Sequence, residues 1–199
     1  RFTTDGTFYM AGGSASNDLE ATAGAYQTTG NAGVNSGYIA HFSADANDLL
    51  SCTYYGGDEA DNIFFIDLDN DENVWVYGQS ANELPITDGV YSEENGTLFV
   101  TKFNPALTEL VAGSMVAAGT WGSGGVPIAF LVDRCDNIYI SAHGASGDLT
   151  TTDDAVYTEG GFYLAAYGPE IETLEFATYY GANHVDGGTS RFDKNGIIY

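Results

Sequence analysis

The sequence has 199 residues, 44% of them hydrophobic, and its 28 acidic against 5 basic residues give a formal net charge of −23. Nucleic acid is therefore not expected as a partner, because phosphate binding depends on clusters of Lys and Arg. No segment approaches the roughly 20 consecutive apolar residues that a membrane-spanning helix needs.

One strand pattern recurs along the chain, each time after a turn rich in Asp, Asn or Gly. It reads DGTFYMAG from Asp5, DENVWVYG from Asp71, CDNIYISA from Cys135 and KNGIIY from Lys194. Regular spacing of this kind, with tens of residues between copies, indicates a repeat architecture.

Four further markers follow in the same order within each copy. The first three are a loop ending in Tyr, a strand that follows Gly, and a strand that ends at Gly. The fourth is a run that leads into the next turn. Their landmarks are Tyr26, Tyr91 and Tyr157; Gly37, Gly96 and Gly161; Gly56, Gly119 and Gly181; and the runs NIFFIDLD, PIAFLVDR and GGTSRFDK.

Each copy thus contains four short strands, and the pattern predicts an all-β fold, a β-propeller with four-stranded antiparallel blades. The predicted units are 1–66, 67–131 and 132–191, with the start of the next at 192–199. Apolar residues fall on both sides of the strand from Leu98 to Phe103, which predicts two covered faces. A β-sandwich is the alternative, but it does not explain the repeat.

Propellers typically close with four to eight blades. We therefore expect these units to be about three blades of a larger propeller, and the chain to be a segment of a longer protein.

Several stretches resemble a known family. The segments YYGGDEADNIFFIDLDNDENVWVYGQS (Tyr54–Ser80), LPITDGVY (Leu84–Tyr91) and LFVTKFNP (Leu98–Pro105) resemble the SBBP-type β-propeller repeat of bacterial secreted proteins. AFLVDRCDNIYIS (Ala129–Ser141) and HVDGGTSRFDKNGIIY (His184–Tyr199) resemble the propeller region of large Bacteroidetes surface proteins, which also carry PKD-type domains and a gliding-motility-associated C-terminal domain.

This resemblance implies export by the type IX secretion system and an extracellular or outer-cell-surface location. It also implies a role in adhesion or surface recognition, and it supplies no catalytic residues. The expected partners are an extracellular protein or glycan, other domains of the same longer chain, and the outer-membrane secretion or surface machinery.

The sharpest local motif is DLDNDEN, in which Asp67, Asp69 and Asp71 alternate. Carboxylates spaced in this way can surround calcium, which prefers six to eight oxygen ligands. The run is not an EF-hand loop, because Glu72 and Gly78 stand where that motif needs glycine and glutamate. The two interpretations are a calcium site and an ordinary hairpin turn.

The remaining reactive residues suggest no catalytic motif. Cys52 and Cys135 fall in different units, so we expect no disulfide between them. His41 lies within a strand pattern, which favours a packed or edge histidine, and Trp121 is interpreted as filling a gap between blades or as a sugar-stacking platform.

We expect a non-enzymatic module for recognition, adhesion or assembly that binds through its loops, chiefly 13–36, 81–95 and 143–160, because binding residues concentrate on loops that a rigid scaffold positions. One alternative is a glycan-active hydrolase or lyase, which would need two carboxylates from different blades in one pocket. The other is a structural spacer.

Overall fold

The computed structural model describes residues 1–81, 84–118, 125–143 and 149–181. Within these ranges the regular structure is antiparallel strands and one short 3₁₀ segment, Pro169–Ile171, and no helix has the length and hydrophobicity needed to cross a membrane. The strands are β1 (Phe8–Ser14), β2 (Ser36–Phe42), β3 (Leu49–Tyr55), β4 (Asp61–Leu68), β5 (Val74–Ser80), β6 (Gly96–Phe103), β7 (Leu110–Ala118), β8 (Val126–Val132), β9 (Ile138–His143), β10 (Phe162–Tyr167) and β11 (Leu174–Tyr180).

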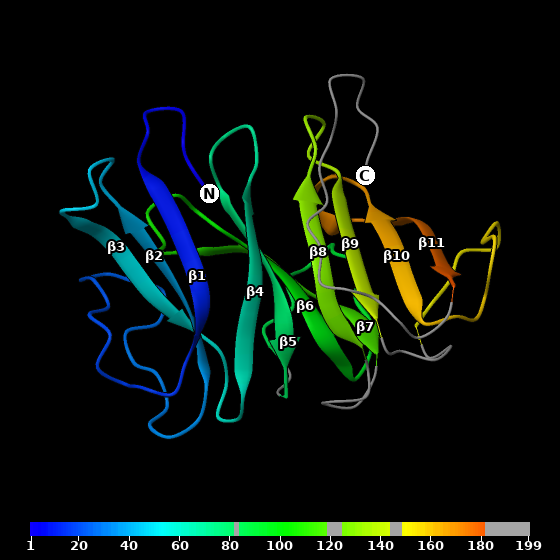
Figure 1. The fold of residues 1–199 in the computed structure, drawn as a ribbon, viewed down its shortest axis with the longest axis horizontal. Helices are drawn as coiled ribbons and strands as arrows, with labels where there is room; N and C mark the ends of the chain where they lie inside the picture. Colours follow the sequence, from blue (N-terminus) through cyan, green and yellow to red (C-terminus); the bar gives the residue numbers. More distant parts are fainter. Residues whose placement is uncertain (82–83, 119–124, 144–148, 182–199) are drawn as a thin grey trace.

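The strands form three sheets in chain order, which confirms the predicted all-β fold. The first sheet has the order β1-β2-β3, the second β4-β5-β6-β7 and the third β11-β10-β9-β8. They stand next to one another across the molecule, with β1, β4 and β8 on the side that faces the viewer in Figure 1. The three sheets do not close into a ring.

The hydrogen-bonded sheets begin earlier than the sequence units. The run that contains β4 was assigned to the end of the first unit, but β4 pairs with β5 and opens the second sheet. In the first sheet, residues 1–3 take the corresponding place beside β1. Phe2 forms a bridge with Phe8, and the Tyr9 N–H donates to the Arg1 carbonyl at 2.8 Å.

A turn of the same geometry precedes the second strand of each four-stranded pattern. Gly6, Glu72 and Asp136 all have positive φ, of 90°, 61° and 61°. In each turn the N–H of the first residue donates to the carbonyl four residues later: Thr3 to Thr7, Asp69 to Asn73 and Asp133 to Asn137. These pairs set the structural correspondence between the sheets.

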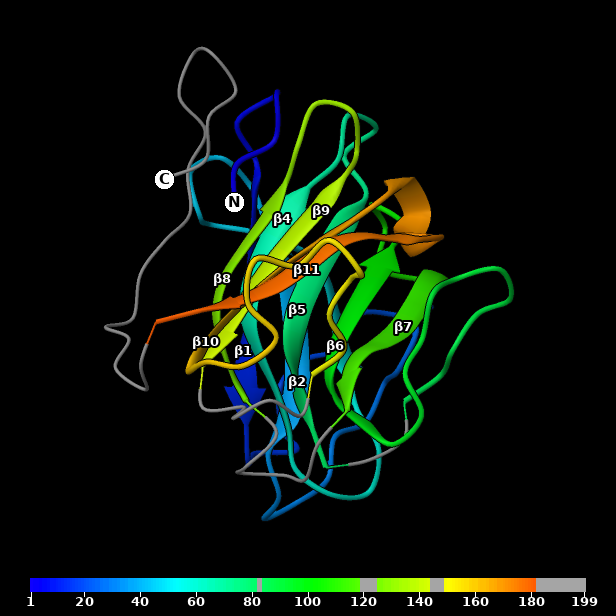
Figure 2. The same cartoon turned by 90° about the vertical axis from the view of Figure 1, so that its right-hand side faces the viewer.

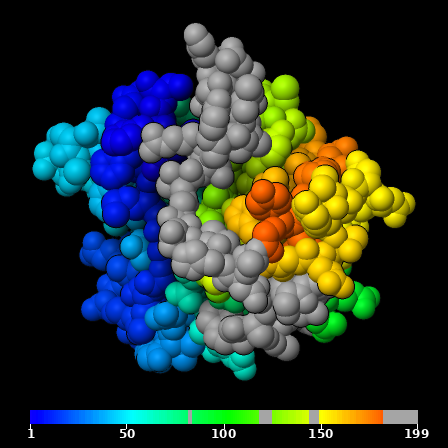
Figure 3. Space-filling view, turned by 45° about the vertical axis from the view of Figure 1, so that its right-hand side comes forward, coloured from blue at the N-terminus to red at the C-terminus, as the bar shows by residue number. Residues whose placement is uncertain are grey.

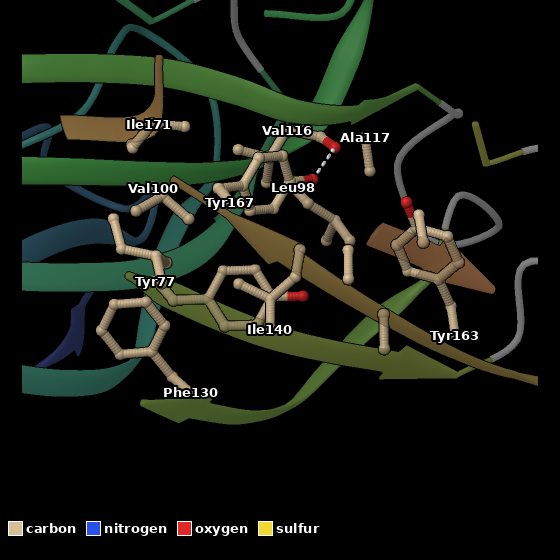
Figure 4. Packing of buried hydrophobic residues seen from close by; sticks show 14 of the residues in the cluster. Tyr77, Leu98, Val100, Val116, Ala117, Phe130, Ile140, Tyr163, Tyr167 and Ile171 are labelled. Carbon is tan, nitrogen blue, oxygen red and sulfur yellow. Dashed lines mark hydrogen bonds between the residues drawn. The ribbon is translucent and has the colours of Figure 1, made fainter. Parts of the chain in front are cut away.

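The core consists of two apolar clusters, one on each face of the second sheet. Val74 and Val76 of β5 face the first sheet, whereas Trp75 and Tyr77 face the third, because successive side chains of a strand point to opposite faces. Every residue of β5 and β6 is buried, which confirms the prediction of two covered faces. Figure 4 shows the cluster between the second and third sheets, where the Tyr167 hydroxyl donates to the Val116 carbonyl at 3.0 Å.

Each junction between sheets carries the same backbone hydrogen bond. The Tyr26 N–H, in the loop after β1, donates to the carbonyl of Leu107 in the β6–β7 turn at 2.9 Å. The Tyr91 N–H, in the loop after β5, donates to Ile171 in the β10–β11 turn at 2.7 Å. Leu107 and Ile171 are both fully buried and have φ values of 58° and 59°. The loop of one sheet therefore docks on the turn of the next.

The structure corrects one sequence alignment. Thr22, Thr87 and Thr152 each donate a backbone N–H to the last strand of their own sheet, at Cys52, Gly113 and Ala177. Counting onward from these threonines, Val156 corresponds to Tyr26 and Tyr91. Tyr157, which the sequence pattern aligns with those tyrosines, lies one position further along.

Candidate functional site

A pocket of about 480 Å³ with a mixed polar and apolar lining opens between the first and second sheets, at the end where the short turns lie. We call it the junction pocket. It is lined by Thr3, Asp5, Thr7, Tyr9, Thr22, Ala23, His41, Leu50, Ser51, Glu72, Pro105, Ala106 and Thr108.

The corresponding position between the second and third sheets is filled by an ion cluster in which Lys102 and Asp69 are buried and Glu170 is half exposed. The Lys102 Nζ lies 3.0 Å from the Asp69 Oδ2 and 2.5 Å from the Glu170 Oε1. The same nitrogen lies 5.2 Å from the centre of the Trp75 ring. The four side chains occupy the space between the two sheets and link them.

Smaller residues stand in these places at the first junction. Tyr9 pairs with His41 across β1 and β2, as Trp75 pairs with Lys102 across β5 and β6. Thr3 is the first residue of its turn, as Asp69 is in the second sheet. Ala106 directly precedes Leu107, as Glu170 directly precedes Ile171, so Thr3 stands at the position of Asp69 and Ala106 at the position of Glu170. The His41 ring stacks on Tyr9 with a centroid distance of 4.0 Å. The junction pocket is therefore the space that the shorter side chains leave.

Two carboxylates from different sheets line the junction pocket. The Asp5 Oδ1 accepts hydrogen bonds from the Thr3 hydroxyl at 2.6 Å and from the Thr7 N–H at 3.0 Å, and these bonds lower its pKa to about 2. The Glu72 Oε1 accepts from the Thr4 hydroxyl at 2.6 Å and the Thr4 N–H at 2.7 Å, which lowers the pKa of Glu72. Both acids are ionised at neutral pH.

A neutral imidazole and a free hydroxyl complete the polar wall. Burial lowers the pKa of His41, although the charges of Asp5 and Glu72 act in the opposite direction, and its Nε2 lies 2.8 Å from the Thr7 Oγ1. Ser51 is paired with His41 across the strands and is only 8% exposed. Its hydroxyl has no hydrogen-bond partner among the described residues.

This combination suits a ligand with several hydroxyl groups. Ionised carboxylates accept hydrogen bonds, while the serine hydroxyl and a neutral histidine can each donate or accept. A buried polar group without a partner carries a desolvation cost that a ligand hydrogen bond would offset.

The three aspartates of the predicted calcium motif have separate surroundings. Asp67 pairs with the Arg1 Nε at 2.7 Å and accepts from the Val132 N–H at 3.2 Å; burial raises its pKa, with Arg1 opposing. Asp69 closes its turn through the Asp71 N–H at 3.0 Å and also pairs with Lys102. The Asp71 side chain is exposed.

The structure does not bring these carboxylates together. Within the described ranges, no group of three His, Cys, Asp or Glu side chains is arranged to hold a metal ion. Asp133 makes the same turn bonds as Asp69, with the N–H groups of Cys135 and Asn137. Asp69 thus has the structural role of the hairpin-turn interpretation, and calcium binding stays a prediction.

The other candidates from the sequence are placed as follows. Cys52 is buried, Cys135 is exposed and both are free, which confirms that no disulfide joins them. His41 is half-buried, and Trp121 lies outside the described residues. The sequence patterns did not single out the junction pocket, because its polar residues come from separate turns and strands. The only signal was the Thr and Asp content of TTDGT (Thr3–Thr7).

Comparison of the sequence with protein-family models and with curated proteins finds no match.

Proposed function

We propose that this chain is a segment of a β-propeller in an exported bacterial surface protein, and that it recognises a glycan through the junction pocket. The propeller is supported by three successive sheets that repeat the same docking of loop on turn. Export by the type IX system, and a place on the outer cell surface or outside the cell, are supported by the resemblance to SBBP-type repeats. Other domains of a longer chain and the surface machinery are further partners in this proposal.

The observation that carries the glycan proposal is the junction pocket itself. It combines the ionised Asp5 and Glu72 with the neutral His41, and Ser51, whose buried hydroxyl has no partner among the described residues, also lines it. Its volume of about 480 Å³ lies within the range of small-molecule sites. The role is non-enzymatic and consists of polar contacts made by a rigid scaffold.

A glycan-active hydrolase or lyase is the second candidate, because Asp5 and Glu72 come from different sheets and line one pocket. Glycoside hydrolysis by a carboxylate pair needs one acid with a raised pKa that can donate a proton to the leaving group. The pKa values of Asp5 and Glu72 are both lowered. This favours binding over hydrolysis.

The test is a titration of the chain with a panel of mono- and disaccharides. Binding is monitored by NMR chemical shifts and by calorimetry. We expect shifts at His41 and Ser51. Ser51→Ala should weaken binding by roughly threefold to tenfold, the value of one neutral hydrogen bond. The control is Val111→Ser, an exposed position on β7, which should bind as the unchanged chain does.

Two outcomes would contradict the proposal. If no saccharide shifts the pocket resonances, the structural-spacer alternative gains support. If a saccharide is cleaved during the titration, and Asp5→Asn abolishes the cleavage, the enzyme alternative is correct.

A further inference from the structure

The junction pocket has a negatively charged lining without a cation to balance it. Asp5 and Glu72 are charged, and no Lys or Arg stands among the described residues that line the pocket. Hydrogen bonds from Thr4 lower the pKa of Glu72, although the charge of Asp5 acts in the opposite direction. Two like charges that share a site repel each other, and a cation placed beside both would stabilise each. The pocket is therefore suited to a positively charged group.

The two carboxylates are held in place before any ligand arrives. The three short turns lie at one end of the molecule, at the top of Figures 1 and 2. The Thr4 N–H and hydroxyl link the turn of Asp5 to Glu72 in the turn of the second sheet. The next two turns repeat this link, because the Asn70 N–H and side-chain amide donate to the Asp136 Oδ1 at 3.3 and 2.9 Å. Groups fixed in this way lose less freedom when a ligand binds.

The second junction shows which cation fits this place in the fold. His41 and Lys102 stand at the same position in consecutive sheets. The primary ammonium group of Lys102 contacts two carboxylates, those of Asp69 and Glu170. His41 supplies no such cation, because its side chain is shorter and burial lowers its pKa, which keeps the ring neutral at neutral pH. The first junction thus has two carboxylates and lacks the ammonium group.

One serine of the lining carries a polar group that packing does not require. Ser51 pairs with His41 across β2 and β3, and Ala112 takes the same place beside Lys102 across β6 and β7. Ala112 is buried with a purely apolar side chain. The Ser51 hydroxyl is also buried, and it has no partner among the described residues. A hydroxyl group of a ligand would offset the desolvation cost that this serine carries.

We infer that the junction pocket takes an amino sugar with a free amine, whose ammonium group lies between Asp5 and Glu72. The hydroxyl groups of the sugar bond to Ser51 and His41. The ligand thus supplies at the first junction the kind of cation that Lys102 supplies at the second. This inference rests on the proposed saccharide site and names the class of saccharide. A lysine side chain of a protein partner carries the same cation, but its hydrocarbon stem offers no hydroxyl to the buried serine.

The inference is tested by calorimetric titration of the chain with matched pairs of sugars at about pH 7, where an amine is mostly protonated. The pairs are glucosamine with glucose and galactosamine with galactose, and N-acetylglucosamine adds an uncharged amide. At least one amino sugar should bind roughly threefold to tenfold more tightly than its partner sugar, a modest factor because water screens the exposed Asp5. Salt at about 0.5 M should remove most of this preference.

Two variants with the same change of charge separate the pocket from the field of the whole chain. Glu72→Gln removes one negative charge from the pocket and should remove most of the preference for the amino sugar. Glu159→Gln removes one from an exposed position in the loop that leads to β10 and should keep the preference. Figure 3 shows this loop, in yellow, on the opposite side of the molecule from the first sheet, in blue. Attraction by the net charge of −23 alone would be the same in both variants. Asp5→Asn takes the place of Glu72→Gln if circular dichroism shows that the latter is unfolded.

The possible outcomes separate this inference from the proposed function. If sugars bind but the amino sugars have no advantage, or if Glu72→Gln and Glu159→Gln behave alike, the inference is overturned and saccharide recognition stands. If no sugar binds, both are overturned. n-Butylamine is the remaining probe, because it carries the ammonium group on a hydrocarbon chain. Binding of n-butylamine as tight as that of glucosamine would overturn the amino-sugar inference in favour of a lysine side chain of a protein partner.

Discussion

Lys102 and His41 occupy the same position in consecutive sheets, each beside an aromatic residue of the neighbouring strand. Lys102 reaches Asp69 and Glu170 across a junction, whereas the shorter His41 stacks on Tyr9 and leaves a polar pocket. A change at this position therefore converts an ionic link between sheets into a candidate binding site.

Replacing Lys102 should destabilise the fold, because the buried Asp69 carboxylate would lose the positive charge that it is paired with. In Lys102→Met the carboxylate of Asp69 stays buried without its cation, and removing one partner of a buried pair costs about 3 to 5 kcal/mol. We expect a loss near 3 kcal/mol, because Glu170 is about half exposed. Urea unfolding measures it. Lys102→Met/Asp69→Asn should recover part of the loss, and an additive or larger loss would show that the pair is not coupled.

Tyr55 and Tyr180 offer a comparison of a buried and an exposed tyrosine. Tyr55→Ala removes a fully buried ring from the first junction and should cost about 3 to 5 kcal/mol of unfolding free energy. Tyr180→Ala should change the unfolding free energy of the monomer by no more than about 0.5 kcal/mol, as is usual for exposed sites. The measurement is made at low protein concentration and low salt. Equal effects at the two positions would contradict this difference in burial.

The pKa of His41 predicts a loss of stability in mild acid. Burial lowers this pKa below the ordinary value of 6.5, so the unfolded chain binds a proton at a higher pH than the folded chain does. The unfolding free energy should therefore be unaffected by His41 above pH 6.5 and should fall between pH 6.5 and the folded-state pKa.

An NMR titration of the His41 ring checks this prediction, since its midpoint should lie below 6.5. Glu72→Gln should move the midpoint further down, because the Glu72 charge raises the pKa of His41. His41→Gln should reduce the slope of stability against pH in that window. A midpoint at or above 6.5 would refute the prediction.

Removal of divalent cations should leave the fold unchanged. Asp67 and Asp69 are already engaged by Arg1 and Lys102, so we expect the melting temperature to differ by less than about 1 °C between buffers with calcium and with a chelator. The matched variant Asp71→Asn should behave in the same way. A calcium-dependent rise in melting temperature that Asp71→Asn abolishes would instead establish the calcium site predicted from the sequence.

The repeated markers were sufficient to predict strands and their covered faces, since side-chain alternation and turn residues are local properties. They correctly indicated that the strand from Leu98 to Phe103 is buried on both sides. They could not assign β4 to the second sheet, because strand pairing depends on hydrogen bonds between segments and not on the order of markers. They also misaligned Tyr157, since similarity of residue type favoured Tyr where the backbone bonds place Val156.

The candidate sites show the same division between local and long-range information. The alternating Asp67, Asp69 and Asp71 could be read directly from the sequence, but their separate partners, Arg1 and Lys102 among them, depend on how sheets meet. His41, Ser51 and Glu72 carry no common motif. They line one pocket only because two sheets pack face to face and short side chains stand where Lys102 and Glu170 fill the next junction.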